Sequence, residues 1–118
     1  MAKEYLEKLE ALLAPAARKL PPEIEFEVKH FFSGAAAYAN GRICITLTTV
    51  GLALKLPEDS RVRLEKKGAK ALRYFPNGPI KKDYVLLPEG YREDKRKLAT
   101  WARKSIDHVL TLPKPKKR

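Results

Sequence analysis

The residues best suited to binding chemistry in this chain are arginines near its C-terminal end. On a helix, Arg92, Arg96 and Arg103 would fall within about 40° of one another at ~100° per residue. Lys97 and Lys104 flank this row. A guanidinium group binds two phosphate oxygens at once, so the row is suited to phosphate. The alternative is an ordinary solvated helix face, because acidic residues are interspersed along the same segment.

A second group of basic residues precedes this row in the sequence. It comprises Arg61, Arg63, Lys66, Lys67, Lys70, Lys81 and Lys82. The first five surround a predicted short helix and its exit. From both groups we select one candidate nucleic-acid surface: Arg92, Arg96, Arg103, Lys104, Lys66, Lys67 and Lys70.

No set of residues forms a recognisable catalytic, cofactor or metal site. His30 and His108 are the 2 histidines, and neither lies in a metal-ligand or nucleophile motif. We expect His108 to complement the dipole at a helix C-terminus. Cys44 lies between two isoleucines, which is typical of a small buried hydrophobe. The glycines form no phosphate-binding loop. The sequence therefore predicts a protein that is not an enzyme and needs no cofactor.

Three carboxylates on one strand face are the remaining candidate for chemistry. Glu23, Glu25 and Glu27 alternate with apolar residues, so they would lie about 6.6 Å apart along a strand. Two of them could share a divalent ion or divide the roles of general acid and general base between them. With no histidine or further carboxylate to complete the site, a solvent-exposed strand face is the favoured interpretation.

Composition indicates a soluble globular protein. The chain has 118 residues, of which 44% are hydrophobic and 33% charged. It contains no apolar run of the ~20 residues that span a membrane, and its first residues mix acids with bases, unlike a signal peptide. A single cysteine fits a reducing cytosol. We expect a cytoplasmic protein with one domain over residues 1–112 and a disordered basic tail over residues 113–118.

Positive charge is concentrated in the later part of the chain. Residues 1–31 hold five Lys/Arg against six Asp/Glu, whereas residues 32–118 hold twenty against eight. This asymmetry indicates an anionic partner, with nucleic acid first and anionic membrane second. Solubility and ion pairing are the alternative explanation.

Hydrophobic spacing predicts an N-terminal helix followed by a strand. The apolar stripe of the helix consists of Leu6, Leu9, Leu13, either Ala16 or Ala17, and Leu20. Pro15 removes a backbone donor, so we expect the helix to end or kink there. Residues 23–30 then alternate between polar and apolar side chains, which predicts a half-buried strand.

A three-stranded meander is predicted over residues 31–55. Asn40-Gly41 separates two apolar runs, which is the strongest short hairpin signal, because a type I′ turn needs positive φ at both positions. Gly51 begins the next strand. Further elements are a short helix opening at residues 57–60, strands at 72–75 and 83–87, and a helix over about 91–110 whose buried side includes Trp101. The order predicts an α+β fold, an antiparallel sheet with N- and C-terminal helices packed on it.

These residues resemble the N-terminal domain of the TfoX (Sxy) family, over roughly residues 24–110. The matching positions are Phe31-Phe32-Ser33-Gly34, Tyr38, Asn40-Gly41, Leu54-Lys55, Gly68, Tyr84, Pro88-Glu89 and Trp101-Ala102. Ser33 stands where the family usually has glycine. The resemblance implies a secretion-chaperone-like α+β fold. Full-length members of the family carry a second helical domain and regulate competence alongside the cyclic-AMP receptor protein.

Two functional hypotheses follow. The first is a regulatory domain that contacts a protein partner, a transcription regulator, and binds nucleic acid weakly and without sequence preference. The second is a pure protein-interaction module whose charge serves solubility. The sequence does not predict an oligomeric state.

Overall fold

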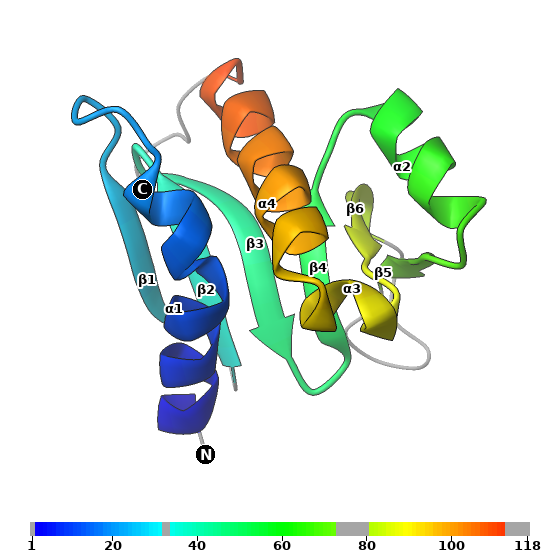
Figure 1. Ribbon diagram of the computed structural model, residues 1–118, viewed down its shortest axis with the longest axis horizontal. Coiled ribbons are helices and arrows are strands. Elements are labelled where there is room, and N and C mark those ends of the chain that lie inside the picture. Colours follow the sequence, from blue (N-terminus) through cyan, green and yellow to red (C-terminus); the bar gives the residue numbers. More distant parts are fainter. Residues whose placement is uncertain (1, 32–33, 73–80, 113–118) are drawn as a thin grey trace.

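The computed structural model describes residues 2–31, 34–72 and 81–112 (Figure 1). Its elements are α1 (Ala2–Arg18), β1 (Phe26–Phe31), β2 (Gly34–Ala39), β3 (Arg42–Thr48), β4 (Gly51–Lys55), α2 (Glu58–Glu65), β5 (Lys70–Leu72), β6 (Lys81–Leu86), α3 (Glu89–Glu93) and α4 (Lys95–Leu110). Ser33, most of the strand predicted at 72–75, and the tail 113–118 lie outside the described residues.

The strands form one six-stranded sheet in the order β1-β2-β3-β4-β6-β5, in which each neighbouring pair is antiparallel. α1 and α4 lie side by side on one face, and α2 lies on the other side of α4 (Figure 1). The predicted α+β fold is therefore confirmed. Among the described helices, none is both long and apolar enough to cross a membrane.

α1 does not end at Pro15, one of the two outcomes expected there, because the helix runs on to Arg18. Proline at this position removes the hydrogen bond to the carbonyl of Ala11. Ala11 is exposed, so water can solvate that carbonyl. Packing of Leu9, Leu13 and Ala16 in the core then holds the helix together past the proline.

The β2–β3 hairpin turns at Asn40-Gly41 as predicted. Asn40 has φ 50° and Gly41 has φ 80°, the two positive angles of a type I′ turn. Gly34, at the start of β2, is required for a different reason. A Cβ at this position would lie 2.2 Å from the carbonyl oxygen of Leu47 on β3, so only glycine allows the two strands to approach.

The C-terminal helical region is two helices, not the single helix predicted from residue 91. Asp94 separates α3 from α4 with extended backbone, at φ −98° and ψ 99°. Its carboxylate accepts hydrogen bonds of 3.1 Å from the backbone N–H groups of Arg96 and Lys97. Asp94 is thus the N-cap of α4, and the free energy of capping favours the break.

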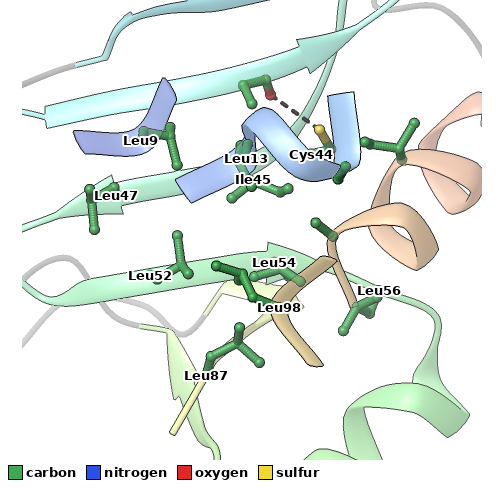
Figure 2. Packing of buried hydrophobic residues seen from close by; sticks show 14 of the residues in the cluster. Leu9, Leu13, Cys44, Ile45, Leu47, Leu52, Leu54, Leu56, Leu87 and Leu98 are labelled. Atoms are coloured by element: carbon green, nitrogen blue, oxygen red, sulfur yellow. Dashed lines mark hydrogen bonds between the residues drawn. The ribbon is translucent and has the colours of Figure 1, made fainter. Parts of the chain in front are cut away.

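The core lies between the sheet and the pair α1 and α4. Leucines from both helices meet residues of β3 and β4, as Figure 2 shows for Leu9, Leu13, Ile45, Leu54 and Leu98. Trp101, expected on the buried side of the helix, is partly buried and packs against this core without being one of its fully buried residues. Its ring lies on the side of α4 that faces α2, where Arg63 lies over it.

Candidate functional site

A basic groove lies between α1 and α4. It has a volume of about 580 Å³. Its lining residues are Ala16, Lys19, Arg96, Ala99, Thr100, Arg103 and Lys104. We call this feature the α1–α4 groove. Three of these lining side chains are small and four are cationic, a composition suited to an anionic ligand.

The amphipathic pattern of α4 positions the cations of the groove. Leu98, Ala102 and Ile106 are buried against the sheet. Residues 96 and 103 are seven positions apart, almost two full turns, so they project from the same flank of the helix toward α1. The burial of the apolar stripe thereby sets the direction of Arg96 and Arg103.

Arg103 is partly neutralised by a neighbour on its own helix. Its Nε donates to Asp107 Oδ1 at 2.9 Å, and the two side chains are 39% and 57% exposed. An ion pair this exposed contributes little stability. Its effect on binding is larger, because the carboxylate competes with any anion for the guanidinium.

Trp101 connects the groove to α2 through two cations. The ring centroid lies 5.7 Å from Lys104 Nζ and 5.8 Å from the guanidinium carbon of Arg63. Both are within the range of cation–π attraction. Trp101 therefore holds a positive charge from α2 and one from α4 over a single aromatic surface.

The structure divides the residues selected from the sequence into separate groups. Arg96, Arg103 and Lys104 come together in the α1–α4 groove. Lys66 and Lys67 follow the end of α2 and Lys70 begins β5; all three are exposed, on the other side of α4 from α1.

Arg92 does not continue the row that Arg96 begins. It belongs to α3, and the extended backbone at Asp94 breaks the helical periodicity between them. The side chain of Arg92 is not among the described parts of the chain. The predicted row is thus reduced, on α4 itself, to Arg96 and Arg103.

Two polar lining residues were not predicted from the sequence. Lys19 follows the last residue of α1, and Thr100 lies between the arginines of α4. No sequence pattern marks Lys19, because its place depends on how α1 packs beside α4. Thr100 could have been found from its position three residues before Arg103.

The other candidates for chemistry are structural in character. Cys44 is buried, and its Sγ donates to the carbonyl oxygen of Ala37 at 3.3 Å (Figure 2). Burial raises the pKa of the Cys44 thiol to about 12. Burial, aided by the charge of Lys55, lowers the pKa of His108. The neutral imidazole is therefore favoured, so His108 is poorly suited to the dipole role expected of it.

The strand carboxylates form no common site. Glu23 precedes β1, and the backbone N–H of Glu25 donates to Asn40 Oδ1 at 2.7 Å. Glu27 pairs with Lys29, with 3.7 Å between Oε2 and Nζ. Within residues 2–31, 34–72 and 81–112, no cluster of three or more His, Cys, Asp or Glu side chains is arranged to hold a metal ion.

A family model decides what kind of domain this is. The TfoX N-terminal domain model matches residues 20–109. The chain belongs to this family. No curated protein shows a significant match to this chain. The match of the TfoX N-terminal domain covers the sheet and nearly all of α4, whereas α1 ends before it begins. The two walls of the α1–α4 groove therefore differ: one belongs to the matched region and the other precedes it.

Proposed function

We propose that this chain is a non-enzymatic, cytoplasmic regulatory domain that contacts anionic partners through the α1–α4 groove, with the phosphates of nucleic acid as the leading ligand. The observation that carries the proposal is the convergence of Lys19, Arg96, Arg103 and Lys104 on one groove. Family membership supports a regulatory role, in keeping with the competence regulators that this domain resembles.

The chemistry of the groove favours phosphate over base recognition. Its cations lie along α4 and just after the end of α1, and its described lining residues include no aromatic ring on which a base could stack. Binding through such phosphate contacts is weak, independent of sequence and sensitive to salt.

A pure protein-interaction module is the second candidate. Among the described residues, Val62, at 41% exposure, is the large hydrophobic side chain that stands out at the surface. Protein interfaces usually bury an apolar centre. A protein partner of this surface would therefore need to be acidic and would use the same cations.

Matched removal of three charges from each basic group tests the proposal. One variant carries Lys19→Ala, Arg96→Ala and Lys104→Ala; the control carries Lys66→Ala, Lys67→Ala and Lys70→Ala. Affinity for a short duplex and for a single strand is measured by fluorescence anisotropy between low and moderate salt. The groove variant should lose affinity for all sequences alike. Its slope of log K against log salt should shrink by roughly 0.9 for each duplex phosphate that it no longer binds.

The control separates position from total charge. It should lose clearly less affinity than the groove variant, because its charges lie across α4. Equal losses would mean that the groove has no special role. If both variants bind as the parent does, the protein-interaction candidate leads.

A further inference from the structure

β1 is one edge of the sheet. It pairs with β2 on one side, and no described strand pairs with its other side. Its sequence, FEVKHF, spans six residues. An edge strand presents a row of N–H and C=O groups to which another strand can add.

The hydrogen bonds at the start of β1 show which of its backbone groups point toward β2. The backbone N–H of Asn40 donates to the carbonyl of Glu25 at 2.7 Å, and the N–H of Glu25 donates to Asn40 Oδ1. Both backbone groups of Glu25 thus point toward β2. These directions alternate along an antiparallel ladder, and the β1–β2 register is unbroken from Phe26 to Phe31. The backbone groups of Phe26, Val28 and His30 therefore point outward.

These outward groups restrict how a second β1 can add in the antiparallel sense. In the registers that pair these outward groups, either Val28 of one copy lies opposite Val28 of the other, or the strands are shifted from that arrangement by two residues. One shift sets Glu27 opposite Glu27 of the other copy, and the opposite shift sets Lys29 opposite Lys29. Like charges directly opposite one another are destabilising. Only the register centred on Val28 sets Glu27 of each copy opposite Lys29 of the other.

We propose that β1 is a homodimerisation edge at which two copies of this chain pair antiparallel about Val28, joining their sheets. The Glu27 and Lys29 side chains are both 58% exposed and lie on one face, so two copies form a ring of four alternating charges. The six outward-pointing residues, three from each copy, contribute six backbone hydrogen bonds. The partner is a second copy because the strand is complementary to itself, and the interface is isologous.

Three further features of the chain suit this dimer. The edge lies within residues 1–31, whose charges nearly cancel, so this segment brings little net charge to the contact. Phe26 and Val28 are half-buried at the margin of the core and would lose exposed area on pairing. α1 packs over β1 and β2, so the two copies of α1 would lie about 10–14 Å apart, which avoids a clash.

Charge reversal tests the pairing. The parent should show a concentration-dependent dimer by analytical ultracentrifugation. Glu27→Lys alone, or Lys29→Glu alone, should raise the dissociation constant about tenfold or more, because each places two like-charge pairs at the centre. An equimolar mixture of these two variants should dimerise again, since each then faces the opposite charge. A parent that remains monomeric up to ~1 mM, or a mixture no better than its components, would overturn the proposal.

Cross-linking tests the register. Val28→Cys should form a disulfide-linked dimer under mild oxidation, because Cα atoms of a hydrogen-bonded pair lie about 5.5 Å apart. His30→Cys on the same edge is the matched control; its two copies would be about 14 Å apart and should not link. Native Cys44 is fully buried and does not compete. Equal cross-linking of the two variants, or none in Val28→Cys, would contradict the proposed register.

Discussion

The Ser105 hydroxyl donates from α4 to the backbone carbonyl of Cys44 on β3, at an oxygen–oxygen distance of 2.9 Å and across 61 residues of sequence. The carbonyl oxygen of Lys55, the last residue of β4, lies 2.8 Å from the same hydroxyl. The hydroxyl proton is therefore shared between a carbonyl oxygen of β3 and one of β4. Ser105 is fully buried. It fixes α4 against the sheet and, with it, the cations of the α1–α4 groove.

Ser105→Ala should therefore destabilise the domain by about 1–3 kcal/mol, because buried carbonyl groups lose a donor. Urea unfolding followed by circular dichroism measures the change. Thr100→Ala, on the exposed side of the same helix, is the control and should stay within about 0.5 kcal/mol of the parent. A Ser105→Ala variant as stable as this control would show that the hydroxyl contributes nothing.

Gly34→Ala should be strongly destabilising, with a loss of about 2 kcal/mol or more. The added methyl group would lie 2.2 Å from the Leu47 carbonyl oxygen, which is backbone and cannot move without separating β2 from β3. Gly90→Ala is the matched control, since a methyl group there would have no atom within 4 Å and alanine favours a helix. Thermal unfolding should rank the Gly34 variant well below the parent and the Gly90 variant at or above it. Similar melting temperatures for both would refute the close approach.

Trp101→Ala should cost about 2–3 kcal/mol, less than the 3–5 kcal/mol typical of a fully buried aromatic residue, because the ring is only half-buried. Unfolding in urea should be followed by circular dichroism and not by tryptophan fluorescence, because the variant lacks the single tryptophan of the chain. A loss below about 0.5 kcal/mol would indicate an exposed ring that is free for binding.

Asp107→Asn should strengthen phosphate binding. The change releases Arg103 from its 2.9 Å ion pair, so the guanidinium gains freedom to contact an anion. The salt slope for duplex binding should become steeper by up to roughly 0.9. Glu7→Gln, on an exposed position of α1, makes the same change in net charge and serves as the control. If both variants gain affinity equally, net charge alone is responsible.

Cys44 should resist alkylation in the folded protein. Burial raises the pKa of its thiol from 9.0 to about 12, and the thiolate is the reactive form. Iodoacetamide at pH 8 should label Cys44 only after unfolding, as mass spectrometry can show. Because the folded pKa is raised, the stability due to this group is fully present below pH 9 and is lost as the pH rises toward 12. Rapid labelling of the native protein would contradict its burial.

Features governed by short-range physics could be predicted from the sequence. The Asn40-Gly41 turn depends on two adjacent backbone conformations, and it appears with φ of 50° and 80°. The apolar stripes of α1 and α4 depend on spacing within one helix. The break at Asp94 also has a local signal, a capping residue, but the periodicity of the arginines predicts one continuous helix across it.

Tertiary structure alone decided which distant residues meet. Lys19 lines the same groove as Arg96, and Ser105 bonds to strands 50 or more positions away. Arg42 likewise donates from its Nε to the carbonyl of Leu112 at 2.9 Å, joining the hairpin to the end of α4. Such pairs carry no pattern in the sequence, because their proximity follows from how buried apolar faces stack the helices on the sheet. Local spacing determined which side of α4 is basic, and packing determined that α1 completes the groove beside it.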